Sequence, residues 1–204
     1  MILYNYDLDM DCYCVRLVAS CLGLDLPVEN IDMFPGAEHL GPRMLALNPR
    51  GTLPVLEDGA LRLTQIPAIL GYLADKAGGA LVPAGEDRAR MAEWLAFAAH
   101  DLAAAPQARA VSLMAAPGDL PGLRAAARAA LRLMDDQMTR IALAGGGYFA
   151  GPALSLADLA LFPAFALSRD FGIDHDEYPA LRLWARRVRT AKGFITMPGI
   201  PDYH

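Results

Sequence analysis

The first third of the chain alternates between strand-like and helix-like patterns. Ile2–Tyr6 alternates apolar and polar residues, and Val28–Met33 is a second run rich in β-favouring residues, so each predicts a strand. Apolar residues at helical spacing separate the two runs. They predict a helix that has Asp11 as its N-cap and ends at Gly23.

Three further short elements follow. Pro42–Leu47 predicts a helix, and Leu53–Glu57 and Ala60–Leu63 flank Asp58-Gly59, a dipeptide typical of a tight hairpin. A helix capped by Thr64 comes next, with its proline tolerated in the first turn. The order strand, helix, strand, helix, hairpin, helix predicts a mixed sheet covered by helices.

The rest of the chain shows helical patterns only. Residues 77–85 are rich in Gly and Ala and predict a linker, and Ser155 and Asp158 have the spacing of a capping box that starts a helix. We therefore predict an α/β domain over 1–76 and an all-helical domain over 86–204, with a ligand site in the cleft between them. The expected helices of the second domain are the one carrying Met91, Trp94, Leu95, Ala98 and Leu102, then Leu123–Leu143, Leu156–Arg169 and Tyr178–Arg189.

Composition narrows the class of protein. The 204 residues are 54% hydrophobic, but charges, Gly and Pro interrupt every apolar stretch before the roughly 20 residues of a membrane helix. The net charge is −5 and there is no long basic block, which argues against nucleic acid as a partner. The first dozen residues lack Lys and Arg, so we expect no secretory signal and a cytoplasmic location. Three cysteines, Cys12, Cys14 and Cys21, fit neither a disulfide framework nor a metal site and are expected as reduced thiols.

Four stretches together resemble the glutathione transferase superfamily. They are Cys12–Leu17, Ala46–Leu56, Gln65–Leu73 and the capping box that starts at Ser155. Each is weak alone, but their order and spacing are specific, and they span essentially the whole chain. The resemblance is to bacterial proteins near the theta, zeta and beta classes. It implies a thioredoxin-like domain followed by a helical domain, a homodimer, and glutathione as co-substrate without a metal.

The resemblance also implies a glutathione-binding edge. Thr52, Leu53 and Pro54 lie where the family has a cis-proline loop, which turns the backbone of the residue before the proline toward the cysteinyl unit of glutathione. Gln65 and Ile66 would begin a helix whose free amides and positive dipole end favour the γ-glutamyl carboxylate. Many relatives have Ser where this chain has Ile66, so one hydroxyl donor is missing and we expect weaker binding of glutathione.

Two basic side chains are candidates for the rim of this edge. His39 matches a histidine that reaches the glycyl carboxylate in theta-like members, although a solvated side chain is the alternative. Arg50 would assist as a cation or remain in solvent.

Asp9 occupies the position at which the family has its thiolate-activating Ser or Cys. A carboxylate about 5 Å from a thiolate repels it by roughly 3 kcal/mol at an effective dielectric of 20, whereas a helix dipole returns only about 0.3 to 1 kcal/mol. Asp9 must then be protonated, be turned away or accept a proton as a base; alternatively it caps the first helix. Cys12 is a second candidate, because a helix N-terminus lowers a thiol pKa. Tyr4 and Tyr6 are further candidates or packing residues.

The Asp7-x-Asp9-x-Asp11 pattern is also typical of two other kinds of site. A calcium loop of the EF-hand type requires Gly and Glu at the places of Cys12 and Val18, which excludes it. A phosphatase with an aspartate nucleophile would explain neither the Asn48–Leu56 pattern nor the Ser155–Asp158 pattern.

We therefore predict a glutathione transferase that acts on a small apolar electrophile. The electrophile would lie over Tyr13, Trp94 and neighbouring helices of the second domain. Isomerase, peroxidase and dehalogenase variants stay open. The main alternative is a member of the fold that binds glutathione or a protein partner without efficient catalysis.

Overall fold

The computed structural model describes residues 1–202. Its N-terminal sheet has the order β2-β1-β3-β4, with β1 parallel to β2 and antiparallel to β3, and β3 antiparallel to β4. Leu3 of β1 lies opposite Val28 of β2 and Leu56 of β3, which fixes the register. The strands are β1 (Ile2–Asn5), β2 (Val28–Asn30), β3 (Val55–Asp58) and β4 (Leu61–Leu63).

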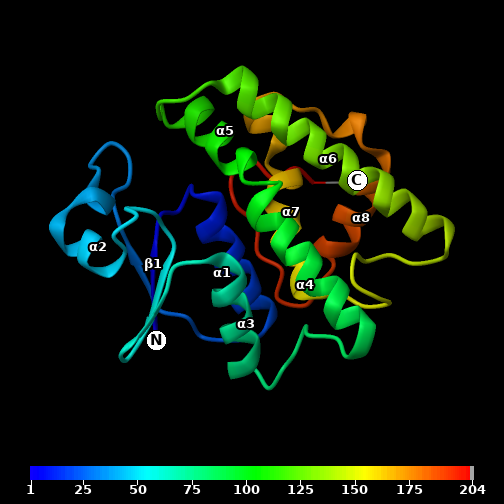
Figure 1. Cartoon of the computed structure of the whole chain (residues 1–204), viewed down its shortest axis with the longest axis horizontal. Coiled ribbons are helices and arrows are strands. Elements are labelled where there is room, and N and C mark those ends of the chain that lie inside the picture. Colours follow the sequence, from blue (N-terminus) through cyan, green and yellow to red (C-terminus); the bar gives the residue numbers. More distant parts are fainter. Residues whose placement is uncertain (203–204) are drawn as a thin grey trace.

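Helices cover both faces of this sheet. Alternation along the strands turns Leu3 and Leu56 toward one face and Tyr4 and Val55 toward the other. Helices α1 (Met10–Cys21) and α3 (Ile66–Lys76) pack against the first face and against each other, whereas α2 (Pro42–Leu47) lies beyond the second face (Figure 1). This is a thioredoxin-like domain, as predicted.

Helix α1 starts differently from the prediction. Asp9, and not Asp11, is its N-cap: the backbone of Asp9 is extended, and its carboxylate accepts a hydrogen bond of 2.7 Å from the amide of Cys12. Asp11 lies inside the first turn. A capping side chain bonds the amide two or three positions further on, and Cys12 is at the third position after Asp9.

The cap predicted for α3 is also wrong. Gln65 is the N-cap, with no capping bond from its side chain, and the helix begins at Ile66. With Thr64 as the cap, the third position would be Pro67, which has no N–H, and only the amide of Ile66 at the second position could donate to the threonine hydroxyl.

The second domain is all-helical. Apart from Asp158, its central helix, α7, is apolar on every side, and it is almost wholly buried because it packs against α1, α4 and α8. Within residues 1–202, no helix has both the length and the apolar character needed to cross a bilayer. The helices are α4 (Gly85–His100), α5 (Ala104–Leu113), α6 (Leu120–Leu143), α7 (Leu156–Ala166) and α8 (Pro179–Arg189), with short 3-10 turns η2 (Ser168–Phe171) and η3 (His175–Glu177).

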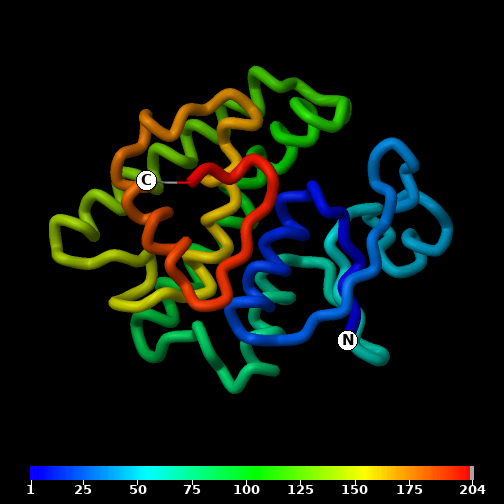
Figure 2. Tube along the Cα trace, turned by 180° about the vertical axis from the view of Figure 1, so that it is seen from behind, coloured from blue at the N-terminus to red at the C-terminus, as the bar shows by residue number. Residues whose placement is uncertain are grey.

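The end of the chain returns to the first domain. Figure 2 shows the segment after α8 in red, running beside the blue trace of α1. The hydroxyl of Tyr13 in α1 donates to the carbonyl of Ile195 at 2.7 Å. The two domains are therefore joined by this segment as well as by the packing of α1 on α7.

Two features of the helical domain differ from expectation. Helix α5 was not predicted, because its Ala-rich sequence gives little contrast between apolar and polar faces. The helix expected over 156–169 ends at Ala166 and continues as the η2 turn.

The predicted capping box at Ser155 is present. The carboxylate of Asp158 accepts from the amide and the hydroxyl of Ser155 at 3.0 and 2.9 Å. It also accepts from the amide of Phe149 at 3.0 Å and from the indole of Trp184 at 2.9 Å. Burial raises the pKa of Asp158, and these four donors oppose that effect.

Candidate functional site

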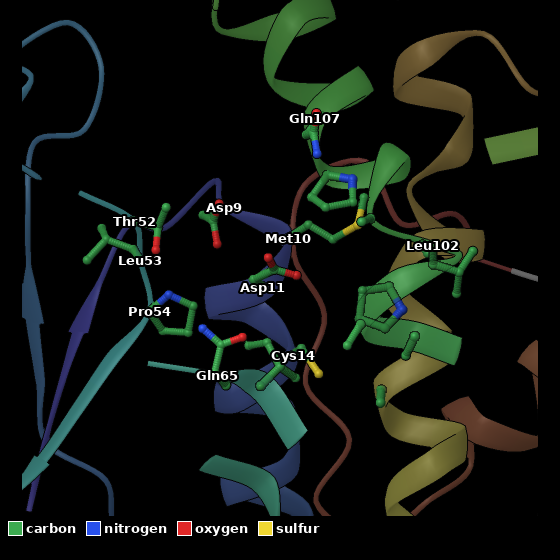
Figure 3. A pocket seen from close by; sticks show the side chains of 18 of the residues that line it. Asp9, Met10, Asp11, Cys14, Thr52, Leu53, Pro54, Gln65, Leu102 and Gln107 are labelled. Carbon is green, nitrogen blue, oxygen red and sulfur yellow. The ribbon is translucent and has the colours of Figure 1, made fainter. Parts of the chain in front are cut away.

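A cleft of about 380 Å³ lies between the two domains. One wall comes from the thioredoxin-like domain and the other from helices α4, α5 and α7 (Figure 3). The first wall consists of Asp9, Met10, Asp11, Cys14, Met33, Arg50, Thr52, Leu53, Pro54, Thr64, Gln65, Ile66 and Pro67. The second consists of Leu95, Ala98, Ala99, Leu102, Ala103, Pro106, Gln107, Ala110, Ala160, Pro163 and Ala164.

The loop before β3 forms one edge of the cleft. The Leu53-Pro54 peptide bond is cis. The loop is held from beneath by Asn48, whose side-chain amide donates to the carbonyl and hydroxyl of Thr52 at 2.8 and 2.9 Å. Gly51 has a φ of +60°, and a Cβ there would lie 2.7 Å from the side chain of Leu40. The turn therefore needs glycine at this position.

The start of α3 forms a neighbouring edge. Gln65 and Ile66 both line the cleft, and the absence of a capping side chain leaves the first amides of the helix open to a ligand. Arg50 lines the same wall. Free amides, the positive end of the helix dipole and a guanidinium together suit a carboxylate.

Two carboxyl groups lie between these edges and the helical wall. Figure 3 shows Asp9 near Thr52 and Pro54, and Asp11 further toward Leu102. Burial raises the pKa of Asp9, although its hydrogen bonds from Cys12 and the charge of Arg109 oppose the shift. Burial, and then the charge of Asp9, raise the pKa of Asp11 to about 7. Both groups are thus more easily protonated than ordinary carboxylates.

Cys12 lies outside the lining of the cleft. Its side chain is fully buried in a small core cluster with Tyr4, Met44 and Val55, and its sulfur accepts from the amide of Tyr6 at 3.4 Å. Burial, reinforced by the charge of Asp9, raises the pKa of the Cys12 thiol well above its ordinary value. This environment opposes the thiolate that the sequence suggested, because the loss of water outweighs the effect of the helix N-terminus.

His39 also lies apart from the cleft lining. It sits in a short 3-10 turn, η1 (Glu38–Leu40), with its ring tilted against Phe34 at 6.0 Å between centroids. Burial lowers the pKa of His39. A neutral imidazole contributes a hydrogen bond and no positive charge, so any role toward a carboxylate is that of a donor.

The aromatic residues expected over the electrophile do not line the cleft. Tyr13 is fully buried in the domain interface, and Trp94 packs on Phe97 and Phe149 elsewhere on the helical domain. Tyr6 donates its hydroxyl to the carbonyl of Phe34 at 3.3 Å, away from the lining.

Sequence reasoning missed the residues that actually line the helical wall. Most are Ala and Pro, which carry no chemical signature, and three come from the unpredicted helix α5: Pro106, Gln107 and Ala110. Cys14 lies in the core, as expected, and it also borders the cleft, with its thiol facing the carbonyl of Leu159 at 3.7 Å.

The fold and the cleft define a class: two-domain proteins in which a thioredoxin-like domain with a cis-proline edge faces an all-helical domain. Comparisons agree. Residues 12–76 match the family described as glutathione S-transferase, N-terminal domain, and residues 123–191 match its C-terminal domain. This chain therefore belongs to the glutathione S-transferase family, which binds glutathione.

Individual relatives extend over most of the chain. Glutathione S-transferase 3 of Zea mays is 32% identical over 82% of this chain and 78% of its own length. Maleylacetoacetate isomerase of Rhizobium meliloti is 30% identical over 95% of this chain and 93% of its own. A crystal structure of a possible glutathione S-transferase from Rhodopseudomonas palustris has a TM-score of 0.85 and 31% identity, covering 98% of this chain and 90% of that one.

Proposed function

We propose that the protein transfers glutathione to a small apolar electrophile. The observation that carries this proposal is the contrast between the two walls of one cleft. The wall of Thr52, Pro54 and Gln65 offers backbone groups and a helix start to an anionic peptide, and the opposite wall offers methyl and methylene groups to an apolar partner.

Glutathione fits the first wall as follows. Its cysteinyl unit lies along Leu53 and Pro54, and its γ-glutamyl carboxylate meets the first amides of α3 at Gln65 and Ile66. Arg50 supplies a positive charge at the same wall. Because Ile66 has no hydroxyl, we expect weaker binding than a serine at this position would give.

Asp9 acts as a base in this proposal. An ionised Asp9 about 5 Å from the sulfur would repel a thiolate by roughly 3 kcal/mol. If its carboxylate instead takes the thiol proton, the neutral acid donates a hydrogen bond back to the sulfur. The raised pKa of Asp9 brings it closer to the thiol value of about 8.5 and makes this transfer less unfavourable.

The atoms and electrons of the transfer then balance without a further reactant. The sulfur electron pair forms a bond to the electrophilic carbon, and a halide leaves with the electron pair of the broken bond. Asp9 returns its proton to solvent and is again a base. With an activated alkene, the same proton goes to the carbanion formed by addition.

Asp9→Asn tests this role. We expect a similar or lower Kd for glutathione, measured by calorimetry, because one negative charge is removed, and a kcat lowered by about tenfold or more with 1-chloro-2,4-dinitrobenzene. Asp7→Asn is the control, because it removes an exposed carboxylate of the same segment that does not line the cleft, and it should keep kcat within about twofold. An unchanged kcat in Asp9→Asn would refute the base, and absence of glutathione binding would refute the function.

We also propose a homodimer, which the family resemblance supports, and light scattering after size-exclusion chromatography tests it. A cytoplasmic location is proposed as well. Isomerisation is the second candidate function, favoured by the identity to maleylacetoacetate isomerase over nearly the whole chain. Binding of glutathione without turnover of any electrophile would instead identify a non-catalytic member.

A further inference from the structure

The helical wall of the cleft is made of small apolar side chains with one polar exception. Among the described residues that line it, Gln107 of α5 is the one with a hydrogen-bonding side chain. It is exposed, and Figure 3 shows it at the end of the cleft above Met10. The remaining lining residues are Leu, Ala and Pro. An apolar guest therefore meets one fixed point at which a polar group is recognised.

The charge of this half of the cleft is one-sided. Asp11 projects between the glutathione edge and the helical wall (Figure 3). Within residues 1–202 it takes part in no ion pair. Arg50 is the one Lys or Arg among the described lining residues, and it belongs to the opposite wall.

From this arrangement we infer that Asp11 and Gln107 are specificity-determining residues, which select an uncharged apolar electrophile with one hydrogen-bonding group and reject carboxylates. The inference rests on the proposed function, since it assigns the electrophile half of the same cleft. It also bears on the choice of reaction, because a dicarboxylate substrate would meet Asp9 and Asp11 in the cleft.

The physical basis is repulsion between like charges at low dielectric. Two carboxylates a few ångström apart in a partly dry cleft repel each other strongly enough to change affinity by tenfold or more. At pH 8 the Asp11 carboxylate, whose pKa is about 7, is mostly ionised. A neutral ester in the same place meets no such penalty.

A matched pair of electrophiles tests Asp11. The pair is 4-chloro-3,5-dinitrobenzoate and its methyl ester, each with glutathione at pH 8 and each corrected for its uncatalysed rate. We expect kcat/KM for the ester to exceed that for the benzoate by about tenfold or more, and Asp11→Asn to shrink this ratio to within about threefold. Asp7→Asn is the control: it removes an exposed carboxylate from the same segment, off the cleft, and should leave the ratio unchanged.

Binding of products separates this inference from the proposed function. The Kd of the two S-aryl glutathione conjugates, measured by calorimetry, should show the same preference for the ester and the same loss in Asp11→Asn. Equal Kd values for the two conjugates would overturn the inference, whether or not turnover occurs. A preference in Kd without turnover would support the selection and overturn the proposed catalysis.

Gln107 is tested with a second pair. Benzyl chloride and 4-nitrobenzyl chloride differ in one hydrogen-bond acceptor. After correction for the uncatalysed rates, Gln107→Leu should lower the preference for the nitro compound by about threefold to tenfold. An unchanged preference would remove Gln107 from the selection.

Discussion

The guanidinium of Arg109 in α5 donates a hydrogen bond to the carbonyl of Leu8, the residue directly before Asp9. Its Nε donates to the carboxylate of Asp170 at 2.7 Å, and the side chain is only 2% exposed. One buried cation thus ties the helical domain to the loop that carries the proposed base. Its charge also lowers the pKa of Asp9 against the effect of burial.

Arg109→Met should therefore destabilise the protein and raise the pKa of Asp9, the proposed base. The substitution leaves the Leu8 carbonyl and the partly buried Asp170 without their partner, which we expect to lower the free energy of unfolding by about 3 kcal/mol in urea denaturation. In the fraction that remains folded, the pKa of Asp9 rises further. The acid limb of the pH profile of kcat should then move to higher pH.

Arg109→Lys separates position from charge. Lysine keeps the cation but cannot hold Leu8 and Asp170 with the same planar fork. We expect part of the stability to be lost and the acid limb to move less than in Arg109→Met. If the acid limb of the kcat profile stays at the same pH in both variants, Arg109 stabilises the fold but does not affect the protonation of Asp9.

Asp158 should be the most sensitive capping residue of the chain. Asp158→Ala leaves Ser155, Phe149 and Trp184 with unpaired buried donors, so we expect a loss of at least about 3 kcal/mol in the free energy of unfolding. Ser155→Ala removes one hydroxyl only and should cost about 1 kcal/mol. Thermal denaturation of the two variants gives the comparison, and equal losses would contradict the network.

His175 should make stability fall in weak acid. Burial lowers its pKa from 6.5 to about 4, so the folded state binds fewer protons than the unfolded state between these values. Stability associated with His175 is therefore full above about pH 6.5 and is lost as the pH falls toward 4, by at most about 3 kcal/mol. Chemical denaturation between pH 7 and 4 measures it.

His175→Phe is the matched variant, because the ring stacks on Phe165 at 4.4 Å between centroids and phenylalanine preserves that shape. The variant should lose less stability than the natural protein across this range. If the free energy of unfolding falls with pH equally in the two proteins, a group other than His175 is responsible for the loss.

The elements with strong local signals were predictable from the sequence. The hairpin predicted at Asp58-Gly59 joins β3 to β4, although Asp58 pairs with Leu61 and the two turn residues are Gly59 and Ala60. The Ser155 capping box starts α7, as predicted. Each of these signals depends on residues a few positions apart. The caps of α1 and α3 were misplaced by one or two residues. Their positions depend on the amide of Cys12, which donates to the Asp9 carboxylate, and on Pro67, which has no amide to donate.

The cleft was predictable on one side only. Thr52 to Pro54 and Gln65 line it and belong to stretches with a recognisable pattern, and Asp9, which also lines it, could be placed from its position just before Cys12–Leu17. The helical wall depends on how α4, α5 and α7 pack, and a run of alanines does not show which of its faces will border a cavity. The role of Arg109 was equally hidden, because Leu8 is 101 positions away in the sequence.

The small residues of the helical wall lead to a last prediction, which concerns the size of the electrophile. Ala99 is exposed on α4 and lines the cleft, so Ala99→Phe fills part of the cavity without crowding the core. We expect kcat/KM for 1-chloro-2,4-dinitrobenzene to fall by about tenfold, while the Kd of glutathione, bound on the opposite wall, changes by less than about twofold. Ala96→Phe adds the same ring at an exposed position of α4 that does not line the cleft, and it should leave both quantities unchanged. If Ala99→Phe leaves kcat/KM as unchanged as Ala96→Phe does, the electrophile does not bind against α4. It would then bind between α5 and the start of α1.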